Sequence, residues 1–255
     1  MESGRVIGVV GARGGIGASS LAAALARRLT RAGPGRRPGR RGGGAATGWP
    51  AARAPAAVAL VDLDAGGGLD VLLGVEGARG LRWPDLTGAR GEVSGAELTA
   101  LLPRWSGVTV LSADRARPGA PPEEVVADVL DALVASHDRV VLDLARRDVL
   151  GGRGPLDRCG VVLVLAARDL RSAAGVLALR SALLAQVPEV RLVVRGPAPG
   201  GLGVLELAHV VDLPVAASMG PQRGFDAALE RGSGPGLRRR GPLARAVDRL
   251  AAGLA

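Results

Sequence analysis

The sequence contains no lysine and no tyrosine, only one cysteine, and aromatic residues make up 2% of its 255 residues. The single thiol, Cys159, cannot form an internal disulfide, and its position just before an apolar run is typical of a buried structural thiol. No apolar run approaches the roughly 18 residues of a membrane-spanning helix, and the N-terminus lacks the layout of a signal peptide. We therefore expect a soluble, cytoplasmic protein.

Acidic residues are missing from one stretch of the chain. The segment from Arg27 to Arg53 holds eight arginines and no Asp or Glu, so it contributes +8 of the formal net charge of +9. Three interpretations stay open: a solvated disordered loop, a surface for weak contact with nucleic acid or an anionic membrane, or a partner-docking segment. The excess of Arg, Gly and Ala is equally compatible with coding bias. His137 and His209 lack a second ligand at metal-binding spacing, so no zinc site is predicted.

The apolar pattern predicts one large α/β domain covering residues 1–255. Short β-branched runs alternate with segments of helical periodicity, and the runs are apolar throughout. The expected strands are residues 5–10, 58–63, 108–111, 139–144, 161–165, 190–194 and a last one near Val215. This alternation predicts a P-loop NTPase-like three-layer α/β/α fold with a mostly parallel central sheet, whose functional residues lie at the carboxyl ends of the strands. Residues 33–55 lack periodicity and are expected to form a flexible Arg/Gly/Pro-rich insertion.

A glycine-rich loop from Gly11 to Ser20 follows the first strand and opens a helix. In this context, backbone amides and a helix N-terminus can hold phosphate. Gly11, Gly15 and Gly17 also match the Gly-x-x-x-Gly-x-Gly spacing of short-chain dehydrogenases. Those enzymes use a Tyr and a Lys four residues apart to move the proton in hydride transfer, and the absence of both residues excludes that activity.

The segment from Arg13 to Ser20 resembles the deviant Walker A loop of the MinD/ParA ATPases, Lys-Gly-Gly-x-Gly-Lys-[Ser/Thr]-[Ser/Thr]. It matches at every position except the two lysines, which are replaced by Arg13 and Ala18. In the family the first lysine reaches the partner's nucleotide across a dimer interface, and the second holds the β- and γ-phosphates. Arg13 would keep the catalytic charge of the first, whereas Ala18 keeps nothing of the second. The nucleotide-binding residues that the resemblance implies are Gly14, Gly15, Ile16, Gly17, Ala18, Ser19 and Ser20.

Two further strand ends resemble motifs of the same family. Val58–Asp64 resembles the Asp-x-Asp motif that precedes switch I, which implies that Asp62 and Asp64 act near Mg²⁺ and the attacking water. Val140–Asp143 resembles the Walker B strand, which implies that Asp143 orders the metal ion together with Asp62 and the Ser19 hydroxyl. An Asp at a strand end can also simply cap the next turn, but three motifs in the family's order favour the site.

Other positions depart from the family. Arg195 stands where the family usually has an Asn that contacts adenine, so it is the implied base-side cofactor contact. After Asp143 the family commonly shows Pro with a small residue, whereas this chain continues with residues 144–147, Leu-Ala-Arg-Arg.

Two segments, Gly80–Leu86 and Val194–Leu202, resemble the CpaE/TadZ-like and septum-site-determining-like branch. The resemblance implies a spatial regulator that binds ATP and Mg²⁺, forms a homodimer and positions cell-division or pilus and secretion proteins, with a location in the cytoplasm or peripherally at the inner face of the membrane. CpaE/TadZ proteins often carry an N-terminal receiver-like domain, and here the first strand begins within a few residues of Met1.

The missing P-loop lysine would remove a charge-assisted phosphate contact worth about 1.5 to 3 kcal/mol. We therefore expect weakened nucleotide binding and slow or absent ATP hydrolysis. The alternative is a non-enzymatic dimeric scaffold of the same fold without a nucleotide cycle. In the closing helix, Leu243, Val247, Leu250 and Leu254 form an apolar stripe that is expected to pack on the sheet rather than to anchor in a membrane.

Overall fold

The computed structural model describes residues 5–32, 56–88, 94–222, 224–230, 234–235 and 241–254. The insertion expected at residues 33–55 lies outside these ranges. The described chain forms one eight-stranded sheet in the order β3-β4-β2-β5-β1-β6-β7-β8. All neighbouring strands run parallel except the short edge pair of β3 and β4. The strands are β1 (Val6–Gly11), β2 (Val58–Asp62), β3 (Arg104–Trp105), β4 (Val108–Leu111), β5 (Arg139–Asp143), β6 (Val161–Ala167), β7 (Val190–Arg195) and β8 (Val215–Met219).

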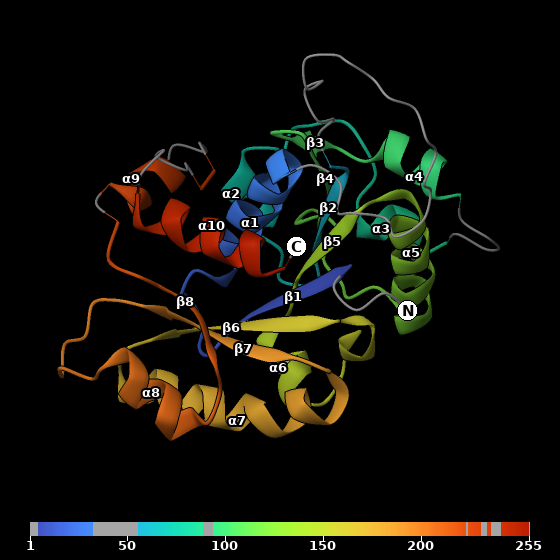
Figure 1. Cartoon of the computed structure of the whole chain (residues 1–255). Coiled ribbons are helices and arrows are strands. Elements are labelled where there is room, and N and C mark those ends of the chain that lie inside the picture. The colour runs from blue at the N-terminus through green and yellow to red at the C-terminus, as the bar shows by residue number, and fades with distance from the viewer. Residues whose placement is uncertain are drawn as a thin grey trace, which may run out of the picture.

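Helices cover both faces of this sheet (Figure 1). On one face α1 packs on β1, β2 and β5, and α10 packs beside it on β8; on the other face α5, α7 and α8 contact β5, β6 and β8. The helices are α1 (Ala18–Ala32), α2 (Leu69–Leu73), α3 (Trp83–Leu86), α4 (Gly95–Leu101), α5 (Glu123–Ser136), α6 (Arg146–Leu150), α7 (Leu170–Gln186), α8 (Val204–Val211), α9 (Phe225–Leu229) and α10 (Pro242–Gly253), with a 3-10 turn η1 (Leu156–Arg158). The predicted three-layer α/β/α fold is confirmed.

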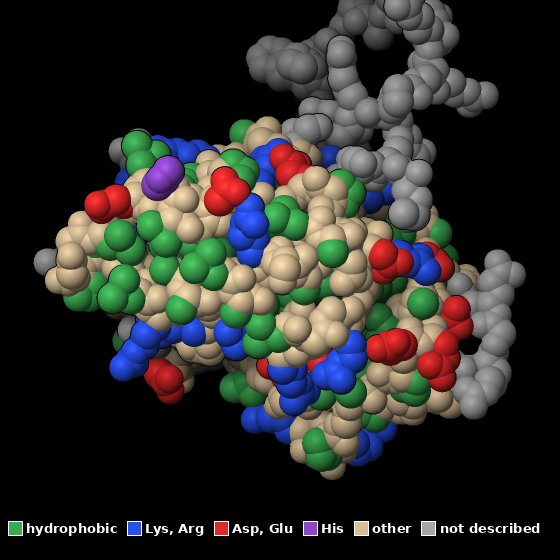
Figure 2. All heavy atoms as spheres, turned by 90° about the horizontal axis from the view of Figure 1, so that it is seen from below, with side chains coloured by type: hydrophobic (Ala, Val, Ile, Leu, Met, Phe, Trp, Pro, Cys, Tyr) green, Lys and Arg blue, Asp and Glu red, His purple; other side chains and the backbone are tan. Residues whose placement is uncertain are grey.

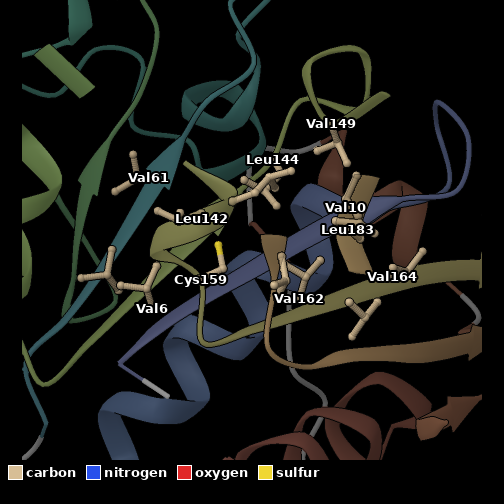
Figure 3. Packing of buried hydrophobic residues seen from close by; sticks show 14 of the residues in the cluster. Val6, Val10, Val61, Leu142, Leu144, Val149, Cys159, Val162, Val164 and Leu183 are labelled. Atoms are coloured by element: carbon tan, nitrogen blue, oxygen red, sulfur yellow. The ribbon is translucent and has the colours of Figure 1, made fainter. Parts of the chain in front are cut away.

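Alternation along the strands divides the core between the two faces. In β1, Ile7 and Val9 belong to the cluster under α1 and α10, whereas Val6 and Val10 belong to the cluster under α5 and α7. Figure 3 shows Val6 and Val10 packed with side chains from β5, β6 and α7. All six residues of β1 are buried. Because helices cover both faces of the strand, it contains only apolar residues and glycine.

The closing helix packs on the sheet, as expected. Leu243, Val247 and Leu250 of α10 are buried, and α10 contacts α1 and β8. The stripe is therefore part of the protein core.

The sequence predictions lacked the short helices α3 and α6, the turn η1, the strand β3 and the helix α8. The strand β3 pairs antiparallel with β4. It has only two residues, so it is too short to show an apolar periodicity in the sequence. The helix α8 is almost wholly apolar, so its pattern does not distinguish a helix from a strand. Its start is fixed by the Glu206 side chain, which accepts a hydrogen bond from the Gly203 amide at 2.9 Å.

The outer surface of α7 and α8 carries apolar side chains among polar ones (Figure 2). The exposed ones are Leu170, Leu177, Leu184, Leu205 and Val210. Within the described ranges, no helix combines the length and apolar character needed to cross a membrane.

Candidate functional site

The sequence-predicted site residues meet at the carboxyl edge of the sheet. The strand β1 leads into the loop Gly11–Ser20 and lies between β5 and β6. In the strand registers, Asp143 pairs with Val9 of β1 and with Asp62 of β2. The two carboxylates therefore end neighbouring strands of the sheet.

The loop conformation depends on its glycines. Gly15 and Gly17 have φ values of 68° and 98°, a region that favours glycine. A Cβ added at Gly11 would lie 2.8 Å from Cγ2 of Ile16 and 2.9 Å from the Arg13 carbonyl, so the loop closes too tightly for a side chain there. Ile16 is buried in the α1 core cluster and holds the loop down. These residues form a turn of fixed conformation, and α1 begins directly after it at Ala18.

The first turn of α1 provides a phosphate-binding geometry. The helix begins at Ala18, and the amide of Leu21 is the donor to the carbonyl of Gly17 at 3.0 Å. Amides at the start of a helix have no carbonyl partner within it and carry the positive end of the helix dipole. This turn contains no acidic residue that would compete with an anion.

Ser19, Asp143 and Asp62 form a polar cluster below the loop. Asp62 and Asp143 are 2% and 5% exposed. Burial, together with the charge of Asp143, raises the pKa of Asp62 to about 8. Burial also raises the pKa of Asp143 to about 6, although the hydrogen bond from the Ser19 hydroxyl opposes this change. Within the described part of the chain, neither of these two adjacent buried carboxyl groups forms an ion pair with an arginine.

This cluster fits a hard divalent cation. Asp62 Oδ1 accepts the Asp64 amide at 3.0 Å, but Asp62 Oδ2 is buried without a hydrogen-bond partner. A hydroxyl and two carboxylates are the oxygen ligands that Mg²⁺ prefers, with phosphate and water completing its shell. No group of three or more His, Cys, Asp or Glu side chains suited to a metal occurs in the described part of the chain, so a cage made only of such side chains is not formed there.

Arg13 points toward α7. Its Nη2 lies 3.2 Å from Asp169 Oδ2, and its Nε donates to the Ser172 hydroxyl at 3.3 Å. The guanidinium is 43% exposed, so this ion pair is weak and leaves the side chain able to rearrange.

Asp64 is exposed, unlike Asp62 and Asp143, although its charge also raises the pKa of both. Its side chain accepts the Gly66 amide at 2.9 Å and lies 3.7 Å from Arg147 Nη2. The Asp-x-Asp motif therefore separates into a buried member, Asp62, and a surface member, Asp64.

Arg195 reaches the phosphate loop from the end of β7. Its Nη1 donates to the Ile16 carbonyl at 2.5 Å, and the position of a Cβ on Gly17 would be 3.3 Å from the same nitrogen. The site residue implied for the base side thus contacts the loop itself.

Sequence reasoning missed three residues that pack around the loop and the end of β2 without facing the proposed ligand. Arg146, the first residue of α6, donates from Nε to the Ala12 carbonyl at 2.9 Å. Trp83 donates from Nε1 to the Asp62 carbonyl at 2.6 Å and fixes the end of β2. Gly175 of α7 packs so closely that an added Cβ would lie 2.0 Å from the Ala12 carbonyl oxygen. The departure from the family pattern after Asp143 was the one signal that pointed to Arg146.

Comparison with sequences gives relatives that are longer than this chain. Two proteins of Mycobacterium tuberculosis, named Uncharacterized protein MT3760 (strain CDC 1551 / Oshkosh) and Uncharacterized protein Rv3660c (strain ATCC 25618 / H37Rv), are each 38% identical over 252 residues. The match covers 97% of this chain and 63% of each relative, so the chain spans less than two thirds of the length of these relatives. No family model matches the sequence.

Comparison with solved structures establishes the fold. A ParA family ATPase from Chlorobium tepidum TLS matches with a TM-score of 0.76 and 16% identity over the whole of both chains. MinD in the MinC:MinD complex of Aquifex aeolicus matches with a TM-score of 0.71 and 16% identity over 98% of this chain and 95% of that one. MinD complexed with Mg-ADP from Pyrococcus horikoshii OT3 matches with a TM-score of 0.66 and 15% identity, again over 98% and 95%. The chain therefore has the fold of the ParA/MinD ATPases.

Proposed function

We propose that this chain is a MinD/ParA-like spatial regulator that binds ATP with Mg²⁺ and hydrolyses it slowly or not at all. The observation that carries the proposal is the buried Asp62–Asp143 pair, with one unpartnered oxygen, beside a fixed glycine loop at a helix N-terminus. Solved structures of the same fold include a complex with Mg-ADP, which supports the same ligand here.

Each group of the site would have a separate task. The amides of the loop and of the first turn of α1 would hold the phosphates. Ser19, Asp62 and Asp143 would hold Mg²⁺, which would neutralise phosphate charge and relieve the repulsion between the two carboxyl groups. Trp83 keeps the end of β2 in place through the Asp62 carbonyl.

We expect weak hydrolysis because the loop places no positively charged side chain at the phosphate site. Phosphoryl transfer needs positive groups placed where charge develops in the transition state. Ala18 supplies none, and Arg13 is directed to Asp169 and Ser172 of α7. Arg13 would have to leave these partners before it could act on a nucleotide across a dimer interface.

The finer assignment is also part of this proposal. We infer a homodimer that positions cell-division or pilus and secretion proteins, as in the CpaE/TadZ-like and septum-site-determining-like branch. The ParA/MinD fold supports the general role, and the MinC:MinD complex is an example of that fold with a protein partner. The basic stretch at residues 27–53 would add weak contact with an anionic membrane or nucleic acid.

Light scattering with and without Mg-ATP tests this function. We expect Mg-ATP to raise the mass from monomer to dimer, and Gly17→Val, which strains a φ of 98°, to block the change. ATP turnover is measured on the same proteins, and the wild type should show little or no hydrolysis. A turnover typical of an intact MinD-like enzyme, abolished by Asp62→Ala, would refute the degenerate-loop assignment.

The second candidate is a non-enzymatic dimeric scaffold, favoured by the loss of positive charge at Ala18. It predicts the same mass with or without nucleotide, and no change in melting temperature on addition of Mg-ATP. These two measurements separate the candidates.

A further inference from the structure

The residue that opens α1 offers no positive charge to a bound phosphate. Ala18 occupies this position, and the loop's own cation, Arg13, donates to Ser172 and Asp169 on α7. A phosphate held only by backbone amides would have its charge only partly compensated. A cation delivered from another element would correct this deficit.

Arg195 is placed to deliver that cation. It ends β7, two strands away from β1 in the sheet, yet its Nη1 donates to the Ile16 carbonyl at 2.5 Å. The same nitrogen would be 3.3 Å from a Cβ on Gly17, the residue immediately before α1. The guanidinium therefore lies against the segment of the loop that leads into the helix N-terminus.

The environment of Arg195 favours an anionic partner. The side chain is partly buried, and no carboxylate of the described residues forms an ion pair with it, whereas nine other described arginines have such a partner. A single backbone carbonyl uses one of the five N–H groups of a guanidinium. The planar fork that remains suits two oxygens of a phosphate.

We propose that Arg195 contacts the phosphates of the bound nucleotide and replaces, from the end of β7, the positive charge that the loop lacks at Ala18. This inference rests on the proposed nucleotide-binding function. It moves Arg195 from the base side of the site to the phosphate side and makes affinity depend on a residue outside the loop.

Arg146 provides a matched control. It also donates to a loop carbonyl, that of Ala12 at 2.9 Å, but it comes from α6, and the Ala12 carbonyl faces Gly175 of α7. Its contact is therefore with Ala12 at the start of the loop, whereas Arg195 contacts Ile16 next to Gly17. Replacing Arg146 changes the total charge near the loop by the same amount without removing the proposed phosphate contact.

The test is calorimetric titration of the whole chain with Mg-ATP, Mg-ADP and adenosine. Arg195→Gln should weaken binding of both nucleotides about tenfold or more, a loss typical of a charge-assisted hydrogen bond, and should leave adenosine binding unchanged. Arg146→Gln should bind nucleotide within about threefold of the wild type. Circular dichroism and melting temperature of the ligand-free variants establish that both are folded.

A rescue variant makes the role specific. Ala18→Lys in the Arg195→Gln background restores the cation at the helix N-terminus and should recover most of the lost nucleotide affinity. Equal nucleotide affinity in wild type and Arg195→Gln would overturn the inference, as would tighter binding, which would make Arg195 a competitor of the ligand. Parallel loss of adenosine binding would assign Arg195 to the base instead. If the wild type binds no nucleotide at all, the proposed function itself fails.

Discussion

Asp62 and Asp143 are register partners at the carboxyl ends of the adjacent parallel strands β2 and β5. Both carboxyl groups are buried, and the charge of Asp143 contributes to the raised pKa of Asp62. A stable fold rarely places two carboxyl groups together in this way without a partner cation, because each disfavours ionisation of the other. The pair is therefore a candidate functional site, and it lowers the stability of the ligand-free protein.

Asp62→Asn should remove this destabilisation. Because the folded-state pKa of Asp62 is raised from 3.8 to about 8, its contribution to stability falls as pH rises through that interval. At pH 8.5 the ligand-free Asn variant should melt at a higher temperature than the wild type, since its amide cannot ionise. It should also lose the stabilisation by Mg-ATP, because the cation loses a charged ligand.

The control for this comparison is Asp157→Asn on η1, where the carboxylate is 73% exposed. Thermal melts at pH 8.5 should show no change for this variant, with or without Mg-ATP. An Asp62→Asn protein stabilised by Mg-ATP as strongly as the wild type would contradict the assignment of Asp62 as a metal ligand.

The same substitution should destabilise the protein at one glycine of the loop and have little effect at another. Gly11→Ala places a methyl group 2.8 Å from Ile16 Cγ2 and 2.9 Å from the Arg13 carbonyl, which should cost about 1 to 3 kcal/mol of unfolding free energy. Gly14→Ala meets nothing within 4 Å, and its φ is not positive. Urea unfolding of the ligand-free proteins should place Gly14→Ala within about 0.5 kcal/mol of the wild type. Equal losses would show that the loop is not closed as described.

Much of the fold could be predicted from the sequence because its signals are local. Apolar runs such as Val161–Ala167 lie on strands covered from both sides, and the glycine loop between Val10 and Ala18 separates a strand period from a helical one. The expected strand bounds differ from the observed ones by at most two residues. β3 and α8 were missed because neither sequence shows an apolar pattern that identifies a strand or a helix.

The site was predicted only as far as short motifs reach. Ser19, Asp62 and Asp143 each sit at a strand end or helix start that the sequence identifies. The partners of Arg13 and Arg195 do not follow from spacing, because they lie 156 and 179 residues away along the chain. Such contacts depend on the order of strands in the sheet, which a single sequence does not specify.

The Arg13–Asp169 contact should contribute less than the helix cap made by the same aspartate. Asp169 Oδ1 accepts the Ser172 amide at 2.7 Å and caps α7, while Oδ2 pairs with the half-exposed Arg13. Asp169→Asn keeps the cap and should change the unfolding free energy by less than about 0.5 kcal/mol. Asp169→Ala loses the cap as well and should cost about 1 kcal/mol.

Chemical denaturation of the two Asp169 variants measures this difference. If Asn were as damaging as Ala, the ion pair would be the stronger contact, and Arg13 would be held too firmly to rearrange on dimerisation. If Asp169→Asn is nearly neutral, as expected, Arg13 can leave Asp169 on dimerisation with little loss of stability.

His137 gives the fold a predictable response to acid. Its Nε2 lies 3.1 Å from the Thr109 hydroxyl, and its Nδ1 lies 3.0 Å from the Ser136 hydroxyl and 3.1 Å from the Leu133 carbonyl, so both nitrogens of the buried ring have polar partners. Burial lowers the pKa of His137, and the charge of Arg104 lowers it further. Below about pH 6.5 the unfolded chain therefore binds a proton that the folded chain does not, and stability falls as pH falls.

The test compares the unfolding free energies of wild type and His137→Gln at pH 7.5 and pH 5.5. At pH 7.5 the wild type should be the more stable of the two, since glutamine only partly replaces the contacts of the ring. At pH 5.5 the gap should narrow by up to about 1.4 kcal/mol, the value of one pH unit of proton linkage, because only the wild type loses stability through the ring. The exposed His209, the chain's other histidine, supplies the control: His209→Gln should preserve the wild-type pH response. A gap that stays constant between the two pH values would mean that His137 protonates in the folded protein as readily as in the unfolded one.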